Sequence, residues 1–258
     1  MQEKLPALFL GHGSPMNVLL DNSFTQTIQQ LGAQLPRPKA IMVISAHWQT
    51  TGTRVTCSNE PEQIYDFYGF PPELNAIMYR PIGAQPYAAM VTNGFNNSEV
   101  KCDSKWGLDH AAWAILKHMY PLADIPVFEM SLNRLGDAQY HYAMGQKLTF
   151  LRENGVLIIG SGNIVHNLGL MDYDLNAPAF AWAEDFDRYV AQALIRREHA
   201  KLITYHNAGP AAQLAVPTNE HFLPLLYVAG LQQPTDQIKF VYEGFQYGSM
   251  SMRCLRIG

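Results

Sequence analysis

The sequence predicts an α/β fold, a single domain over residues 1–258 with a central, mostly parallel mixed sheet flanked by helices on both faces. Apolar runs at 8–10, 41–44 and 156–159 have the length and composition of buried strands. Residues 24–35, between the first two runs, have helical spacing, so this part forms a βαβ unit with parallel strands. No repeat or change in composition divides the chain.

The rest of the chain continues this alternation. Further strands are predicted at 54–57, 99–102, 125–131, 238–242 and 249–257, and further helices at 87–94, 137–154 and 178–198. A short glycine-containing turn joins the last two strands, which predicts some antiparallel pairing there. Asp109 is the predicted N-cap of a helix that begins at His110.

Composition indicates a soluble protein that acts on a small molecule. The chain is 48% hydrophobic, its net charge is -4, and it has no Lys/Arg block for nucleic acid or a membrane surface. Cys57, Cys102 and Cys254 are odd in number and far apart, so we expect neither a disulfide framework nor a CxxC metal site. With no apolar leader or membrane-spanning segment, we expect a cytoplasmic monomer or small homo-oligomer.

Histidines follow two of the predicted strands. His12 stands between Gly11 and Gly13, and His47 follows the second strand after two small residues. The carboxyl ends of parallel strands meet at one edge of an open sheet, where ligands bind. The two imidazoles therefore form a candidate metal site, although each taken alone is also explained as a hydrogen-bonded structural histidine.

Three more histidines are candidates for the same edge. His166 follows the third strand after a turn of small residues, which suits a mobile acid/base; the alternative is a histidine packed at a helix start. His110, at a helix N-terminus, is well placed to meet an anionic substrate oxygen, or else is a surface histidine. Glu220 and His221 are adjacent, so only one of the two is expected to face inward.

Residues 65–86 are rich in Tyr, Phe, Pro and Gly, too broken for a regular helix and too aromatic for a solvated linker. This loop either forms one wall of a site for a flat apolar substrate or covers core. Tyr65 in the loop and Trp113 are our candidate substrate-binding residues. The remaining helical histidines are interpreted as surface or packing residues; they include His118, His141 and His199.

These histidines predict a mononuclear metal centre. Three imidazoles, or two with a carboxylate, leave one face of the metal open, as in non-haem Fe(II) enzymes and catalytic zinc sites. The chain lacks HExxH, GxSxG and a phosphate-binding GxxxxGK[ST] loop. The sequence also shows no obvious aspartate placed to bridge two metals. A binuclear hydrolase, a serine hydrolase and a nucleotide-binding enzyme are therefore disfavoured.

Six stretches, in order along nearly the whole chain, resemble the class III extradiol ring-opening dioxygenases, the protocatechuate 4,5-dioxygenase-like enzymes, in the 4,5-DOPA dioxygenase branch. They are Gly11-His-Gly-Ser-Pro15, Ser45-Ala-His-Trp48, Tyr65-Asp-Phe-Tyr-Gly-Phe-Pro71, Gly107-Leu-Asp-His-Ala-Ala-Trp113, Ser161-Gly-Asn-Ile-Val-His-Asn-Leu168 and Pro217-Thr-Asn-Glu-His-Phe-Leu-Pro224. The resemblance implies an α/β fold with one iron. The implied reaction inserts both atoms of O2 into a catechol such as L-DOPA by extradiol (4,5) cleavage and yields a semialdehyde acid.

The same resemblance implies roles for the histidines. His12, His47 and His221 resemble metal ligands, with Glu220 as the alternative to His221. His166 resembles the acid/base, although it is sometimes assigned to the metal in this branch, and His110 resembles the histidine that contacts a substrate oxygen. Fe(II) is expected for activity, and Zn(II) is a competing occupant of the purified protein because it binds more tightly.

Two departures from the family pattern limit the resemblance. The usual Asp-His-Gly is Asp-His-Ala here, with Ala111 in the third position, and residues 169–173 differ from the plant pigment-forming enzymes. Two alternatives in other functional classes remain. One is a mononuclear zinc hydrolase with His166 or Glu220 as base, and the other is a non-enzymatic metal-binding interaction protein of the same fold.

Overall fold

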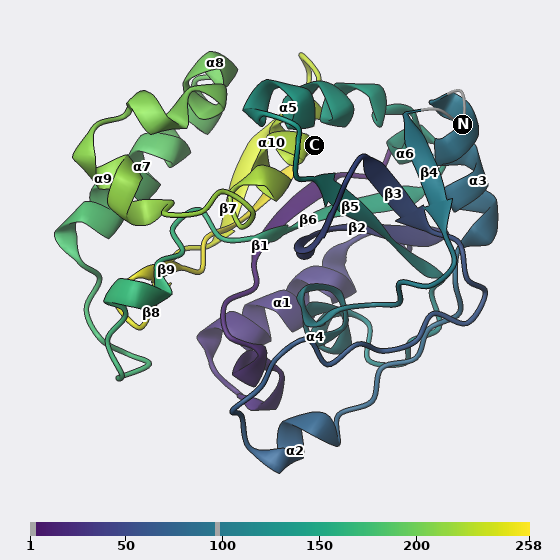
Figure 1. The fold of residues 1–258 in the computed structure, drawn as a ribbon, viewed down its shortest axis with the longest axis horizontal. Coiled ribbons are helices and arrows are strands. Elements are labelled where there is room, and N and C mark those ends of the chain that lie inside the picture. The colour runs from purple at the N-terminus through teal and green to yellow at the C-terminus, as the bar shows by residue number, and fades with distance from the viewer. Residues whose placement is uncertain (1–3, 96–98) are drawn as a thin grey trace.

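The computed structural model describes residues 4–95 and 99–258, which form an α/β domain around an eight-stranded sheet (Figure 1). The strand order is β4-β3-β5-β2-β6-β1-β10-β7. These strands are β1 (Ala7–Gly11), β2 (Ala40–Thr50), β3 (Thr53–Thr56), β4 (Val100–Asp103), β5 (Val127–Asn133), β6 (Val156–Gly162), β7 (Ile238–Tyr242) and β10 (Cys254–Ile257). The four central strands, β5, β2, β6 and β1, are parallel, whereas β10 pairs antiparallel with β1 and β7. The predicted mixed, mostly parallel sheet is confirmed.

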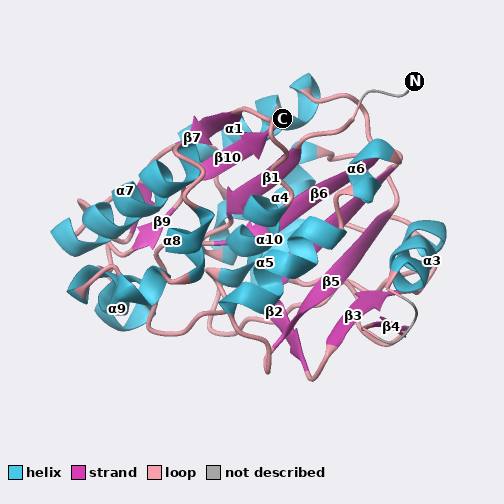
Figure 2. Cartoon of the chain, turned by 90° about the horizontal axis from the view of Figure 1, so that it is seen from above, coloured by secondary structure: helices cyan, strands magenta, loops and turns pink. Residues whose placement is uncertain are grey.

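Helices cover both faces of this sheet, as predicted. The helices are α1 (Ser23–Gln34), α2 (Pro72–Asn75), α3 (Gln85–Gly94), α4 (His110–Met119), α5 (Ala138–Lys147), α6 (Phe150–Glu153), α7 (Ala181–Ile195), α8 (His199–Ile203), α9 (Pro210–Ala215) and α10 (Leu223–Gly230). Three 3-10 turns are η1 (Pro15–Leu19), η2 (Leu168–Leu170) and η3 (Tyr205–Asn207). Figure 2 shows α5 and α10 lying over the central strands.

Alternation along β1 explains why both faces need a cover. Ala7 and Phe9 point into the core beneath α5, α7 and α10, whereas Leu8 and Leu10 point into the core formed with α1 and α4. All four side chains are buried. Successive side chains of a strand point to opposite faces, so an entirely apolar strand needs packing on both sides.

Two predicted elements are divided in the structure. The helix expected at 137–154 ends at Lys147 and resumes at Phe150, because i→i+3 hydrogen bonds from Leu148 and Leu151 tighten the chain into a turn between α5 and α6. The strand expected at 249–257 is also two strands. Its first part, β9 (Met250–Ser251), pairs with β8 (Phe245–Gln246) in a separate two-stranded sheet, and only β10 joins the main sheet.

The cysteine prediction needs correction. Cys57 and Cys102 form a disulfide with Cα atoms 5.8 Å apart, although 45 positions separate them in the sequence. Parallel pairing of β3 with the edge strand β4 brings them together, which cysteine spacing could not predict. Cys254 is free and buried. No helix in the described parts of the chain is both long and apolar enough to cross a bilayer.

Candidate metal centre and active site

A pocket of about 820 Å³ opens at the carboxyl edge of the parallel strands. Its inner surface carries a histidine cluster, here called the pocket floor: His12, His47, His110, His166 and His221. The structure thus brings together all five histidines that the sequence proposed for one site. They come from β2, from α4 and from the segments that follow β1, follow β6 and precede α10.

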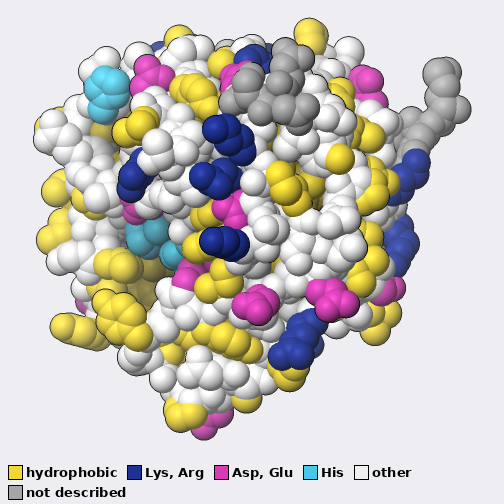
Figure 3. Space-filling view, turned by 45° about the vertical axis from the view of Figure 1, so that its right-hand side comes forward, with side chains coloured by type: hydrophobic (Ala, Val, Ile, Leu, Met, Phe, Trp, Pro, Cys, Tyr) yellow, Lys and Arg dark blue, Asp and Glu magenta, His cyan; other side chains and the backbone are white. Residues whose placement is uncertain are grey.

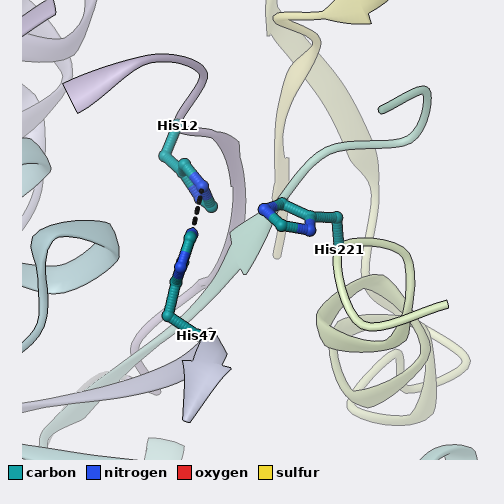
Figure 4. Close-up of side chains that lie close together, drawn as sticks. All are labelled: His12, His47 and His221. Atoms are coloured by element: carbon teal, nitrogen blue, oxygen red, sulfur yellow. Dashed lines mark hydrogen bonds between the residues drawn. The ribbon is translucent and has the colours of Figure 1, made fainter. Parts of the chain in front are cut away.

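Three of these histidines converge on one point (Figure 4). His12, His47 and His221 each offer one ring nitrogen, and these nitrogens all lie within 4.8 Å of one another. Nε2 of His12 is 3.3 Å from Nε2 of His47. Two further groups, His47–Asp66–His110 and His166–Glu220–His221, share members with the first and meet the same distance limit.

Backbone contacts fix the positions of His12 and His221. The His12 amide donates to the Gly162 carbonyl at the end of β6, and the next residue but one, Ser14, begins the cap of η1. Directly after β6, the Asn163 amide donates to the His221 carbonyl over 2.8 Å. A Cβ at Gly162 would lie 2.1 Å from that carbonyl oxygen, so the approach requires glycine.

His47 reaches the site in a way that the sequence did not predict. The strand does not stop at His47; β2 continues to Thr50. Its pairing with β6 ends at Ser45, and its register with β5 shifts between Ile44 and Gln49. Because an irregularity of this kind bends the strand and redirects side chains, it accounts for His47 facing the pocket.

The outer nitrogens of the three convergent rings are also held. Nδ1 of His12 is 3.1 Å from Ser161 Oγ, and Nδ1 of His221 is 3.1 Å from Glu220 Oε1. Nδ1 of His47 lies 3.3 Å from Asp66 Oδ2. These contacts leave the Nε2 atoms to face one another, and metal-binding histidines are oriented by such partners. The Glu220 carboxylate thus contacts the outer nitrogen of the His221 ring.

The local environment keeps the imidazoles neutral. Burial, followed by repulsion from neighbouring imidazoles, lowers the pKa of His12 and of His47 well below its ordinary value. Burial also lowers the pKa of His221. For Glu220, burial acts to raise the pKa, but its hydrogen bond with His221 outweighs burial and lowers it. The cluster therefore offers neutral nitrogen lone pairs, the form that binds a metal.

His166 stacks on His221, with ring centroids 3.6 Å apart and planes 8° apart. Its amide donates to the Ala215 carbonyl. Burial, with a further contribution from His221, lowers the pKa of His166 to about 3. His166 is thus a neutral imidazole at the pocket surface near pH 7.

Asp66 is a site residue that the sequence analysis missed. Its Oδ1 accepts a hydrogen bond from the His110 amide, and its Oδ2 is 2.9 Å from His110 Nδ1. Burial acts to raise the pKa of Asp66, but the hydrogen bonds with His110 outweigh it and lower the pKa. The available signal was a single acidic residue inside the aromatic stretch Tyr65-Asp-Phe-Tyr.

Comparison with known proteins agrees with this arrangement. Residues 6–253 match the family model described as the catalytic LigB subunit of aromatic ring-opening dioxygenase. The chain belongs to this family. The dioxygenase is 42% identical to a protein of Escherichia coli K12 named 4,5-DOPA dioxygenase extradiol, over 99% of this chain and 95% of that one. It is 36% identical to a Beta vulgaris protein of the same name, over 94% and 92% of the two chains.

A solved structure has the same fold. The crystal structure of an uncharacterized protein from Escherichia coli K12 matches with a TM-score of 0.87 and 39% identity, covering 98% of this chain and all of that one. The predicted family, the fold and the predicted class of enzyme, an extradiol ring-cleaving dioxygenase, are therefore confirmed.

The aromatic loop of the dioxygenase forms part of the pocket. Its Phe67, Tyr68 and Phe70, together with Leu168 and Met171 from across the opening, make up what we call the outer wall. The two predicted substrate-binding residues lie elsewhere. Tyr65 and Trp113 are absent from the pocket lining within the described chain.

Tyr65 and Trp113 pack against each other behind the outer wall. The Tyr65 hydroxyl donates to the Ile77 carbonyl, and the fully buried Trp113 donates through Nε1 to the Ile64 carbonyl. Their ring centroids are 5.7 Å apart, and Phe67 packs against both rings. In this position they support the loop that carries Phe67.

A buried pair of acids lies behind His47 and His110. Asp109 caps α4 as predicted, accepts a 2.6 Å hydrogen bond from Ser45, and donates through its amide to Glu129. Burial, followed by repulsion between the two carboxyls, raises the pKa of Glu129 well above its ordinary value, and Asp109 is shifted in the same direction. Nothing in the local pattern of β5 indicated a buried glutamate.

Proposed function

We propose that His12, His47 and His221 bind a single Fe(II) and that the dioxygenase opens a catechol such as L-DOPA at its 4,5 bond, giving a semialdehyde acid. The convergence of three neutral imidazole nitrogens within 4.8 Å at the floor of an 820 Å³ pocket carries this proposal. The relatives named as 4,5-DOPA dioxygenases, 42% and 36% identical to this chain, support the choice of catechol.

The donor set fits such a metal. Three imidazoles on one side leave the opposite side free for substrate, and neutral nitrogen suits both Fe(II) and Zn(II). When bound, Fe(II) would supply the redox-active centre at which the diphenol and O2 react. Ser161, Asp66 and Glu220 would hold the three rings in the required orientation.

His166 is the proposed acid/base. Its imidazole is neutral at pH 7 and so has a free lone pair, which would accept a proton from a catechol hydroxyl and return it later in ring opening. The lowered pKa favours the return of that proton. Stacking on His221 supports a position for this ring beside the proposed ligand set. His166 therefore moves protons at the substrate oxygens.

His110 is the proposed contact for a substrate oxygen. Asp66 binds Nδ1 of His110, which leaves Nε2 to face the pocket. When Nε2 carries a proton as well, it donates to developing negative charge on a substrate oxygen, and a fixed donor of this kind contributes roughly a few kcal/mol to catalysis. Asp66 thereby orients His110 and His47 together.

The test starts from metal-free protein loaded with Fe(II) without oxygen, then mixed with L-DOPA and air. We expect oxygen uptake together with a yellow semialdehyde, and neither with Zn(II) in place of iron. H166A should retain one iron per chain and lose about 10²- to 10⁴-fold in kcat. H206A, which removes an exposed histidine, is the matched control.

Three results would contradict the proposal. Failure of the iron-loaded protein to consume oxygen with any catechol would exclude the activity. Hydrolysis by the zinc form would favour the zinc hydrolase. Loss of iron from H166A would move His166 into the ligand set.

We also predict a cytoplasmic location and a monomeric or small oligomeric state. Cell fractionation tests the location, and light scattering tests the oligomeric state.

A further inference from the structure

We infer that Glu129 is a positioning residue for the pocket floor and acts, through Asp109, on His47 and His110. The inference rests on the proposed function, because it takes His47 as a metal ligand and His110 as a substrate contact. Figure 3 shows histidine side chains in a hollow of the surface. Glu129 is fully buried and does not line the pocket, so it reaches the site only through other residues.

Glu129 joins the loop before α4 to the sheet. It lies in β5, and its Oε1 accepts a 2.8 Å hydrogen bond from the Asp109 amide. Its Oε2 accepts a 3.0 Å hydrogen bond from Nε1 of Trp106. The amide of Glu129 donates to Thr56 Oγ1 in β3 over 2.9 Å. One buried side chain therefore fixes Asp109, the N-cap of α4, relative to β5.

Asp109 connects this support to both histidines. Its Oδ1 accepts a hydrogen bond from the Ala111 amide in the first turn of α4, the helix that begins at His110. Its Oδ2 accepts a 2.6 Å hydrogen bond from the Ser45 hydroxyl. The Ser45 oxygen in turn accepts a 3.1 Å hydrogen bond from the His47 amide. A continuous series of hydrogen bonds thus joins the acid in β5 to the backbone of His47.

The backbone of His47 depends on this series because the sheet does not hold it. β2 pairs with β6 only as far as Ser45, and its register with β5 is interrupted between Ile44 and Gln49. Within these described strands, His47 has no partner residue in either register, and its amide donates to Ser45. A shift of Ser45 therefore moves the residue whose Nε2 is 3.3 Å from Nε2 of His12.

The carboxyl groups of Asp109 and Glu129 are buried together without a cation. No lysine or arginine in the described chain forms an ion pair with either acid. Asp109 lies at a helix N-terminus, which favours negative charge, whereas burial and repulsion from Asp109 raise the pKa of Glu129 well above its ordinary value. Glu129 is therefore the protonated partner, and a hydrogen bond joins the two carboxyl groups.

A double-variant cycle between Glu129 and Ser45 tests the inference. E129Q keeps the shape of the side chain but leaves one acceptor oxygen for two N–H donors, and S45A removes the hydroxyl that links Asp109 to His47. We expect each variant to lower kcat of the iron-loaded enzyme about tenfold and to weaken Co(II) binding to metal-free protein about tenfold. Because both act on the same series of hydrogen bonds, the double variant should lie within about threefold of the more impaired single variant.

T56V is the matched control. It removes the hydroxyl that accepts from the amide of the same glutamate, on the side of β5 that faces away from β2. T56V should lower the urea concentration at the midpoint of unfolding but leave kcat and Co(II) affinity within about twofold of the wild type. If E129Q does not fold, W106F takes its place in the cycle, because it removes one of the two donors to Glu129.

The outcomes separate this inference from the proposed function. If no catechol is consumed but the two variants weaken Co(II) binding non-additively, the ring-opening assignment fails and the role of Glu129 stands. If ring opening occurs and the effects of E129Q and S45A multiply to about 100-fold, Glu129 does not act through Ser45 and the inference is overturned. Equal losses of kcat in T56V and E129Q would also overturn it, because reduced stability of the sheet would then explain both.

Discussion

The pocket floor and the outer wall are built in opposite ways. His12 and His221, 4% and 6% exposed, are held by backbone hydrogen bonds to the end of β6 and by partners on their outer nitrogens. Tyr68, 95% exposed, lies on a loop, and Leu168, 54% exposed, lies in the short 3-10 turn η2. The sheet therefore sets the positions of the histidines on the pocket floor. Side chains of the outer wall, which would contact the ring substituent of a bound catechol, can change without disturbing that sheet.

The largest effect is expected when a proposed metal ligand of the pocket floor is removed. H221A should lose bound iron and lower kcat/KM roughly 1,000-fold or more, because a catalytic metal supplies several kcal/mol. Iron content by metal analysis and oxygen uptake measure the two effects, with H206A as control. Retention of one tightly bound iron with normal turnover would remove His221 from the ligand set.

The next largest effect is expected at Asp66, which contacts two histidines of the pocket floor. D66N keeps the shape of the side chain but removes the negative charge shared by His47 and His110, and we expect a loss of about 10- to 100-fold in activity or metal affinity. Steady-state kinetics and metal titration measure it. D185N, at an exposed acid far along the chain, should behave as the wild type; a D66N enzyme that does likewise would show that Asp66 has no orienting role.

A smaller effect tests the buried acid pair behind the floor. The pKa of Glu129 is raised by burial, so its contribution to stability is complete below its ordinary value of 4.5 and is lost as pH rises through the folded-state pKa. Relative to E129Q, in which this side chain cannot ionise, the free energy of unfolding of the wild type should therefore fall as pH rises, by about 1–3 kcal/mol.

Urea unfolding between pH 5 and 9 measures this dependence. E60Q, which changes an exposed glutamate, is the control and should keep the wild-type slope. A slope in E129Q equal to that of the wild type would mean that Glu129 is ionised in the folded protein throughout this range.

The smallest effect comes from the outer wall itself. Because Tyr68 is 95% exposed, Y68A should change the free energy of unfolding by less than about 0.5 kcal/mol. It should raise KM for alkylcatechols about twofold to fivefold and leave kcat unchanged, since a partly exposed wall residue buries only part of an apolar group. A large fall in kcat would place Tyr68 with the pocket floor and remove the contrast between the two regions.

Much of the site could be predicted because its residues follow local patterns. An apolar run that stops at Gly-His-Gly, as at His12, indicates a buried strand and marks its carboxyl end. Asp66 and Glu129 could not be found in this way. Asp66 acts through a loop that folds back onto α4, and Glu129 lies within an otherwise apolar strand, so only contacts distant in sequence reveal either role.

The sequence by itself determined the α/β class and the strand that precedes His12, because strand and helix periodicity depend on neighbouring residues. It also determined the order of the histidine motifs along the chain. Tertiary structure alone decided which nitrogens face one another, that Glu220 contacts the outer nitrogen of His221, and that Cys57 meets Cys102. These features depend on sheet register and on loops that return from far along the chain. The physical reason is that local propensity fixes an element, whereas packing fixes its neighbours.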